Sequence, residues 1–176
     1  SRDVAQRFNS RYGDTFVVPT PDIKKDGARV MSLDDPTKKM SKSDRNPGSY
    51  IALTDTPAEI TKKIKRAVTD SGSEVVAAPD KPAVTNLISI YSLFAGITVQ
   101  EVQDRYVGKG YGAFKGDLAG VIVEALAPFQ RRFADLQAEP EVAQDVLRDG
   151  AERASAQART KMTLVRERMG LSQHRV

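Results

Sequence analysis

The chain has 176 residues, of which 40% are apolar and 28% charged, a balance typical of an ordinary water-soluble globular protein. It contains no cysteine, which excludes disulfides and thiolate metal sites and fits a reducing cytoplasm. The single histidine, His174, excludes multi-histidine zinc sites, and its place in the frayed carboxyl terminus excludes histidine acid/base catalysis. No apolar run approaches the roughly 18 residues of a transmembrane helix and no signal peptide opens the chain, so we expect a cytoplasmic protein without a membrane contact. The net charge of +4 suits a nucleic-acid partner, although many proteins carry such a charge without one.

The first fifty residues predict little regular structure. Residues 1–13 have the pattern of the end of a helix that stops at Gly13, and the uncapped start suggests that the natural chain extends upstream. Residues 15–18 are short, β-branched and aromatic, which predicts a strand. Residues 19–48 are rich in Pro, Gly, Asp and Lys around one apolar island at 28–33, and a loop of this length is usually functional or disordered.

From residue 50 onward the sequence predicts one more short strand, at 50–53, and then only helices. Thr56 and Glu59 form a capping box that opens a helix with one apolar stripe. The stripe consists of Ile60, Ile64, Ala67 and Val68, and the basic residues Lys62, Lys63, Lys65 and Arg66 are expected to face solvent. A second apolar helix ends at Gly96, and a second capping box at Thr98 opens a short helix that ends near Gly108.

Two long helices are expected to close the chain, at about 113–137 and 141–169. Pro128 should kink or break the first of them. The apolar stripes place four aromatic side chains in the core rather than on a base-stacking surface: Tyr91, Phe94, Phe129 and Phe133. On the last helix the residues expected to face inward are Val142, Val146, Ala151, Ala154, Ala158, Met162, Val165 and Met169.

The segment most informative about chemistry is residues 36–44, which offers three lysines and two serine hydroxyls on a loop. Two ammonium groups at this spacing can surround one polyphosphate, and nucleotidyl transfer needs positive charge where negative charge develops. The alternative is a solvated, lysine-rich surface loop of no special role.

The order of the residues favours the first interpretation. Lys39-Met40-Ser41-Lys42-Ser43 reproduces the second signature of the class I aminoacyl-tRNA synthetases, and its neighbours resemble the bacterial-type tryptophanyl-tRNA synthetase family. The resemblance runs from about residue 3 to residue 171 and is carried by the segments 27–38, 63–71, 86–92, 108–115 and 150–152.

This resemblance implies a mainly α chain made of two parts. Residues 1–50 would be the last part of a Rossmann-like α/β catalytic domain, and residues 51–176 a helical anticodon-binding domain. The family's first signature, a histidine-x-glycine-histidine run, cannot occur in a chain whose only histidine is His174. We therefore expect this chain to be a carboxyl-terminal fragment that is inactive alone.

The resemblance also implies the reaction and the residues that serve it. In the family, tryptophan and magnesium-bound ATP form tryptophanyl-adenylate, and tryptophan then passes to its tRNA. Lys39 and Lys42 would hold the pyrophosphate as catalytic residues, Ser41 and Ser43 would hold the phosphates or the loop, and Val30 and Met40 would lie against the adenine. For Lys38 a phosphate contact and a solvent position remain equally open. No dedicated carboxylate site for Mg²⁺ is seen in the sequence.

Four residues are candidates for contact with tRNA. Lys62 and Arg66 lie on the basic helical face, Asp70 follows that helix directly, and Lys109 lies in the Gly-Lys-Gly-Tyr-Gly segment. We hypothesise that Asp70 contacts an anticodon base, with the alternative that it caps the turn after the helix. Residues 108–112 lack the spacing of a phosphate-binding loop and are expected to connect two helices.

Two other functions stay open at this point: a catalytically silent helical RNA-binding or adaptor module, and a tyrosine-specific ligase. The family's members are homodimers whose main contacts are expected upstream, so this fragment is expected to be monomeric.

Overall fold

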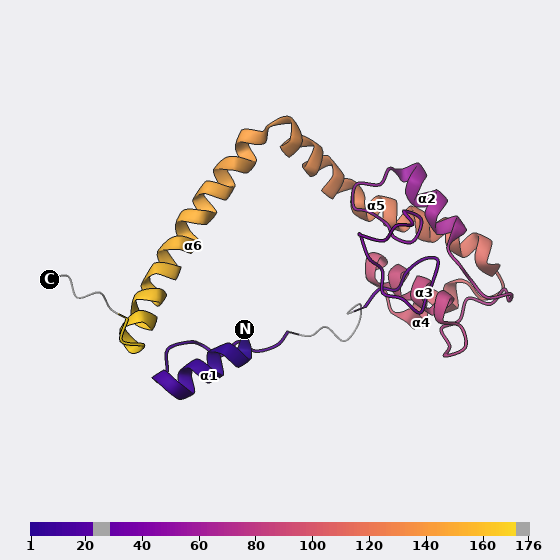
Figure 1. The fold of residues 1–176 in the computed structure, drawn as a ribbon. Helices are drawn as coiled ribbons and strands as arrows, with labels where there is room; N and C mark the ends of the chain where they lie inside the picture. The colour runs from indigo at the N-terminus through magenta and orange to yellow at the C-terminus, as the bar shows by residue number, and fades with distance from the viewer. Residues whose placement is uncertain (23–28, 172–176) are drawn as a thin grey trace. The chain divides into compact units, whose positions relative to one another are not determined.

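The computed structural model describes residues 1–22 and 29–171, and within these ranges it contains six α-helices and no β-strand (Figure 1). The mainly α class is confirmed. The helices are α1 Arg2–Tyr12, α2 Pro57–Arg66, α3 Pro82–Ala95, α4 Val99–Arg105, α5 Gly110–Ala138 and α6 Pro140–Arg168. Residues 23–28 of the expected long loop, and His174, lie outside the described ranges.

The chain forms two compact units, Lys24–Ala134 and Ser1–Ile23 with Asp135–Val176. The first unit contains the lysine-rich segment together with α2, α3, α4 and most of α5. The domain boundary expected at residue 50 stays a prediction for the complete protein.

Both capping boxes predicted from the sequence are confirmed. The Thr56 N–H donates to the Glu59 carboxylate at 2.8 Å while the Glu59 N–H donates to the Thr56 hydroxyl at 3.3 Å, and Thr98 and Glu101 repeat the pattern. Each box satisfies backbone donors that the first helical turn would leave unpaired. Helix α3 ends at Gly96, whose φ of 66° is a left-handed conformation that glycine adopts without strain.

The core of the larger unit is formed by the apolar stripes of α2, α3, α4 and α5. Phe114 lies at its centre, with its ring 5.1 Å from that of Tyr106 and 6.1 Å from that of Tyr91. Its fully buried members also include Ile60, Ile64, Val84, Leu87, Ile88, Val102, Leu118 and Ile122. Leu33, from the loop before α2, is buried in the same cluster, so the loop and the helices share one core.

Of the four aromatic residues expected in the core, only Tyr91 is buried there. The prediction is wrong for Phe94, Phe129 and Phe133, which are each about two-fifths exposed. Helix α5 is not broken at Pro128 but continues to Ala138. The buried residues of this helix extend as far as Leu126, and Phe129 and Phe133 lie beyond the core and are exposed.

Neither expected strand forms, because side chains take the place of a neighbouring strand. The amide of Asn9 accepts the N–H groups of Thr15 and Phe16 at 3.0 and 2.8 Å and donates to the Phe16 carbonyl at 2.7 Å. At residues 50–53, the Asp55 carboxylate accepts the Ala52 N–H at 2.9 Å and Gln130 donates to the Leu53 carbonyl at 2.9 Å.

In the smaller unit, α1 packs on the last turns of α6. Lys161 donates to the Thr15 carbonyl at 2.8 Å and Arg168 to the Tyr12 carbonyl at 3.1 Å. Helix α1 ends at Gly13, as expected. The inward stripe predicted for α6 is wrong except at Val165, because its other members, from Val142 to Met169, are exposed.

Within the described residues, no single helix is both long enough and apolar enough to cross a membrane. The bent pair of α3 and α4 passes that test only when the two helices are taken together.

Candidate functional site

Residues 30–40 form a short antiparallel hairpin, which we call the signature hairpin. Met31 lies opposite Lys39, and two backbone hydrogen bonds flank this pair, from Ser32 N–H to Lys38 O at 2.9 Å and from Met40 N–H to Val30 O at 3.0 Å. The turn between the two legs is closed by a 3.0 Å bond from the Lys38 N–H to the Asp35 carbonyl. Lys39 therefore occupies a fixed register in a segment that the sequence predicted only as loop.

The first leg of the hairpin, residues 30–33, is the inner leg, and it is hydrogen-bonded to the rest of the unit at Met31 and at Leu33. At Met31, the side chain of Asn86 on α3 accepts the N–H and donates to the carbonyl, both at 2.9 Å. At Leu33, the N–H donates to the Ser49 carbonyl at 2.9 Å, and the carbonyl accepts the Val68 N–H at 2.8 Å. Val68 lies two residues after the end of α2 and Asn86 lies within α3, so the hairpin is bonded to the segment after one helix and to the body of another.

The tip segment, residues 41–46, carries the remaining hydroxyls and the second lysine of the signature. The hydroxyls of Ser41 and Ser43 are hydrogen-bonded to each other at 3.0 Å, and the Asp44 N–H donates to the Ser41 carbonyl at 3.2 Å. The ammonium groups of Lys39 and Lys42 are exposed, and neither has an ion pair or hydrogen bond within the part of the chain that the structure describes. Both cations are therefore available to an anionic ligand.

Lys38 differs from its two neighbours. Its ammonium pairs with the Asp35 carboxylate at 2.9 Å. The hydrogen bond from Lys38 holds the pKa of Asp35 at about 2, and the same carboxylate raises the pKa of Lys38. This engagement within the turn favours a structural role for Lys38 over a phosphate contact.

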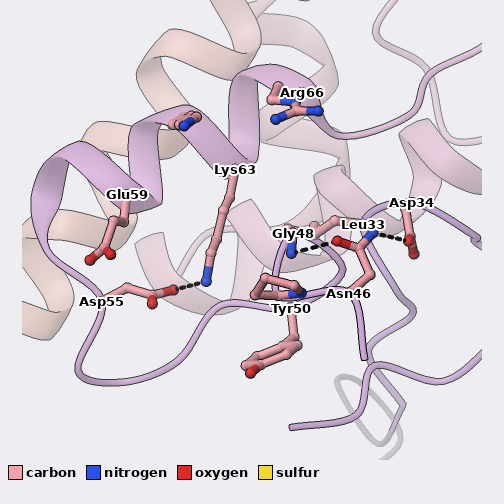
Figure 2. A pocket seen from close by; sticks show the side chains of 11 residues that line it. Leu33, Asp34, Asn46, Gly48, Tyr50, Asp55, Glu59, Lys63 and Arg66 are labelled. Atoms are coloured by element: carbon pink, nitrogen blue, oxygen red, sulfur yellow. Dashed lines mark hydrogen bonds and ion pairs between the residues drawn. The ribbon is translucent and has the colours of Figure 1, made fainter. Parts of the chain in front are cut away.

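Asp34 and Asn46 are hydrogen-bonded to each other and so hold together the two ends of residues 34–46, which include the turn of the hairpin, its second leg and the tip segment. The Asn46 amide donates to Asp34 at 2.6 Å, and its oxygen accepts the Gly48 N–H at 3.0 Å (Figure 2). Hydrogen bonds from Ser32 and Asn46 lower the pKa of Asp34, so that its carboxylate stays ionised. The segment between residues 34 and 46 is thus closed at its base and free at its tip.

A pocket of about 450 Å³ lies between this base and α2 (Figure 2). Three basic and three acidic side chains line it: Lys62, Lys63, Arg66, Asp34, Asp55 and Glu59. The acidic groups are all engaged within the protein, Asp34 by Asn46, Asp55 by Lys63 and Glu59 by the Thr56 capping box. Among the charges that line the pocket, those without a partner in residues 1–22 and 29–171 are therefore the positive ones of Lys62 and Arg66.

The expectation that Lys63 faces solvent is wrong. Its side chain is only 15% exposed, and its ammonium pairs with Asp55 at 2.5 Å and lies 5.1 Å from the centre of the Tyr50 ring. Figure 2 shows it pointing down from α2 toward Asp55, away from the outer face of the helix. Asp55 is held from the other side by Gln130 of α5, which donates to its backbone carbonyl at 2.9 Å.

The four residues expected to contact tRNA lie on two neighbouring features. Lys62 and Arg66 are exposed on α2 and also line a shallower hollow on its outer side. Asp70 follows α2, and both of its oxygens accept from the Tyr111 hydroxyl, at 2.7 and 2.9 Å. This contact joins the Asp70 loop to the first turn of α5, two residues after the exposed Lys109.

The environment of Asp70 keeps it ionised. The hydrogen bond from Tyr111 lowers its pKa below the ordinary 3.8, and the Gly72 N–H adds a second donor at 2.7 Å. A lowered carboxyl pKa contributes stability above the ordinary pKa, and this stability is lost as the pH falls through the lowered value.

The Gly-Lys-Gly-Tyr-Gly segment, residues 108–112, lies partly in the connection between α4 and α5 and partly in α5 itself. Gly108 and Lys109 connect α4 to α5, as expected, whereas Gly110 already begins α5. Gly108 and Gly110 have φ of 74° and 71°, left-handed values that explain glycine at both positions. The Lys109 ammonium lies 5.6 Å from the centre of the Tyr106 ring.

Sequence reasoning missed Asn86, which holds the signature hairpin from α3. The available signal was a single amide within the apolar run of α3, a position where a buried polar side chain must find partners. It also missed Asp34 and Asn46, for which no local pattern gave a signal. Among the described residues, no three His, Cys, Asp or Glu side chains gather as a metal site would require.

Comparison with known proteins adds to this geometry. The family model of the class I tRNA synthetases (W and Y) matches residues 1–127. The chain is 51% identical to the tryptophan–tRNA ligases of Bacillus anthracis and Caldanaerobacter subterraneus subsp. tengcongensis, over 99% and 97% of its own length. It covers 53% and 52% of those proteins, so it spans about half the length of the curated relatives it matches.

Solved structures agree with the sequence comparison. The tryptophanyl-tRNA synthetase of Mycoplasma pneumoniae aligns with a TM-score of 0.83 at 31% identity, over 98% of this chain and 54% of that one. The Campylobacter jejuni enzyme, complexed with ADP and tryptophan, aligns with a TM-score of 0.66 at 28% identity, over 97% of this chain and 52% of that one.

Proposed function

We propose, from the premise that this chain belongs to the class I tRNA synthetases (W and Y), that it is the carboxyl-terminal half of a tryptophan–tRNA ligase. The observation that carries the proposal is that Lys39 of the signature hairpin and Lys42 of the tip segment have no partner among the described residues, in a chain about half identical to known tryptophan–tRNA ligases. The ligase would join tryptophan to ATP as the adenylate, release pyrophosphate, and then transfer tryptophan to tRNA.

The signature hairpin would supply the positive charge for the first step. When the tryptophan carboxylate attacks the α-phosphate, negative charge grows on the departing pyrophosphate. Lys39 and Lys42 would stabilise that charge most strongly in the transition state, where it is largest. Ser41 and Ser43, which bond to each other in this structure, would donate to the phosphates or hold the tip.

The adenine would lie against the inner leg of the hairpin. The Val30 carbonyl is already engaged by the Met40 N–H, so contact at Val30 would use its N–H or its side chain. Met40 is half-buried beside it and offers an apolar thioether surface. Mg²⁺ would be held by the phosphates of the nucleotide, because the described residues offer no cluster of carboxylates for it.

The amino-acid specificity is tested in the complete polypeptide that carries this sequence, because we propose that the 176-residue chain alone does not activate an amino acid. We expect ATP–pyrophosphate exchange that depends on tryptophan. Exchange with tyrosine instead would assign the chain to the other branch of the family. No exchange with either amino acid, alongside binding of tRNA, would favour a silent RNA-binding module.

We further propose that α2 and the loop after it bind tRNA for tryptophan, through Lys62, Arg66, Asp70 and Lys109. Lys62 and Arg66 present unengaged charges next to a pocket, which suits phosphodiester groups of an RNA backbone. RNA sequence is normally recognised in single-stranded loops, and an anticodon provides one.

The double variant Lys62→Ala/Arg66→Ala should weaken binding to tRNA with the native anticodon and to an anticodon-altered copy by the same factor. Phosphate contacts carry no sequence information, and the slope of log affinity against log salt should fall by about 1 to 2. Filter binding at several salt concentrations measures both quantities. Arg153→Ala, which removes an exposed charge paired with Asp149 on α6, should leave them unchanged. An unchanged salt slope in the double variant would remove α2 from the tRNA surface.

Asp70→Ala should lose discrimination between the native and the altered anticodon, because we propose that Asp70 contacts an anticodon base. Tyr111→Phe provides the matched control, since it removes the hydroxyl that bonds to Asp70 but keeps the carboxylate. Aminoacylation of tRNA with the native anticodon and of the altered copy, by the complete polypeptide, measures the discrimination. We expect Tyr111→Phe to retain most of it in this assay. An equal loss in both variants would show that Asp70 acts only by ordering the loop, and unchanged discrimination in Asp70→Ala would exclude any role in reading the anticodon.

This assignment also implies a cytoplasmic location, where tRNA is aminoacylated, and a homodimeric complete protein. We propose that the 176-residue chain by itself is monomeric.

A further inference from the structure

We infer that Asn86 of α3 is a positioning residue of the signature hairpin, which holds Lys39 in register through its bonds to Met31. This inference rests on the proposed function, because the loop it positions is the proposed ATP loop. It concerns a residue that lies 55 positions away from its partner in the sequence.

The hairpin leaves the N–H and the carbonyl of Met31 without a partner in the hairpin itself, and Asn86 bonds to both. Met31 and Lys39 form a non-hydrogen-bonded pair of an antiparallel ladder. The backbone hydrogen bonds of the ladder lie on either side of this pair, between Ser32 and Lys38 and between Val30 and Met40. In such a pair the N–H and C=O groups point outward, toward the position of a further strand. In this protein the amide of Asn86 takes that position and pairs with both groups of Met31 at 2.9 Å.

The geometry requires a primary amide. The side chain must offer one acceptor atom and one separate donor atom, which a primary amide provides and an ionised carboxylate, a single hydroxyl or an aliphatic group does not. Asn86 is only 7% exposed, and it lies on α3 between core residues Val84 and Leu87. A buried amide in this setting cannot exchange its partners for water without cost, so the contact is persistent.

The consequence for the site follows from the ladder. Met31 is fixed to α3, Val30 and Ser32 on either side of it bond to the opposite leg, and Lys39 lies between those two bonds. Asn86 thereby sets the position of the Lys39 backbone relative to the helical core. Removing the amide would leave two backbone groups of Met31 unpaired and free the inner leg to shift. A shift of about 1 Å in a group that acts on a reacting centre can cost about 100-fold in rate.

The test uses Asn86→Leu, which keeps the size and removes both hydrogen bonds, in the complete polypeptide. We expect the kcat of tryptophan-dependent ATP–pyrophosphate exchange, per active site titrated, to fall about 10- to 100-fold. The KM for ATP should rise, and the KM for tryptophan should stay within about twofold, since that substrate does not contact the hairpin in this proposal. Asn86→Asp keeps the acceptor for the Met31 N–H and loses the donor, so it should give an intermediate loss and serves if the leucine variant does not fold.

A matched control exists within the same chain. Asn9 pairs with the N–H and carbonyl of Phe16 in the same way that Asn86 pairs with Met31, but it belongs to the other compact unit of the chain. Asn9→Leu should lower the melting temperature without changing kcat per active site by more than about threefold, because surviving folded molecules keep the hairpin in place. If Asn86→Leu also lowers only the number of active sites, and leaves kcat per site at the parent value, the inference is wrong.

A second readout separates this inference from the proposed function. In hydrogen exchange, the N–H groups of Ser32 and Met40 should exchange faster in Asn86→Leu than in the parent, while those inside α2 keep their protection. If the parent protein shows no tryptophan-dependent ATP–pyrophosphate exchange, the proposed function fails. Hydrogen exchange at the backbone N–H groups still decides whether Asn86 holds the hairpin. Unchanged protection of Ser32 and Met40 would overturn the inference in either case.

Discussion

Lys42→Ala in the complete polypeptide should lower the rate of tryptophan-dependent ATP–pyrophosphate exchange by about 100- to 1000-fold, with little change in the KM for tryptophan. The Lys42 ammonium has no partner among the described residues, so its charge is available to a ligand. Removing one group that stabilises charge developing in a transition state typically costs this much in kcat. Steady-state exchange kinetics at varied ATP and varied tryptophan measure the effect.

Lys38→Ala is the control for this experiment. It removes the same charge four residues earlier in the chain, but the Lys38 ammonium is engaged by Asp35 and the side chain is 74% exposed. We expect its exchange rate to stay within about threefold of the parent, as for an exposed ion pair of small energetic weight. A rate for Lys42→Ala that is equally close to the parent would contradict the proposed role and favour a silent adaptor.

Phe114→Ala should destabilise the unit formed by residues 24–134 by about 3 to 5 kcal/mol, as expected for removing a fully buried aromatic side chain. The ring is in contact with those of Tyr91 and Tyr106, and its loss would leave a cavity among α3, α4 and α5. Since whole domains are stable by only about 5 to 15 kcal/mol, the variant should be close to unfolding. Urea denaturation followed by circular dichroism measures the change.

Phe129→Ala is the matched control, because it removes the same ring from the same helix at a position 43% exposed. Its cost should remain below about 1 kcal/mol. Equal costs for the two variants would mean that the core is not centred on Phe114. The loss at Phe114 should also weaken the signature hairpin, because Leu33 is buried in the same core.

Local patterns in the sequence predicted the helices well where each helix carries its own start and stop signals. Thr56 with Glu59, Thr98 with Glu101, and Gly96 each act within one turn of the chain, so the relevant physics is visible in a few neighbouring letters. The expected strands failed for the opposite reason. A strand needs a partner, and at residues 15–18 the partner is the side chain of Asn9, which a pattern of β-branched residues does not reveal.

Apolar periodicity was also an incomplete guide to burial. It predicts which face of a helix is apolar but not how far along the helix a neighbour extends. Val165 is buried in the part of α6 where Lys161 and Arg168 bond to the end of α1 and the residues that follow it, whereas Val146 belongs to the same predicted stripe and is exposed.

The candidate site also has some features that the sequence predicted and others that it did not. The residues of the signature were evident from their order, and the structure places Lys39 and Lys42 as unengaged cations. The register of Lys39, the closure of the tip by Asp34 and Asn46, and the hold exerted by Asn86 depend on contacts between distant residues. The sequence signals only that the amide of Asn86, within an apolar helix, needs partners, and it contains no local signal for which groups they are or for the other contacts. The roles of all these residues in ligand binding stay predictions.

The pairing of Met31 with Asn86 also has a consequence for how the protein is made. A ribosome adding about 5 to 20 residues per second needs about 3 to 11 seconds to pass from residue 31 to residue 86. During that interval the inner leg of the hairpin has been synthesised, but the amide that completes its hydrogen bonding does not yet exist. The signature hairpin therefore cannot reach its final form while it emerges, and its assembly must wait for translation of a helix that lies beyond it in the message.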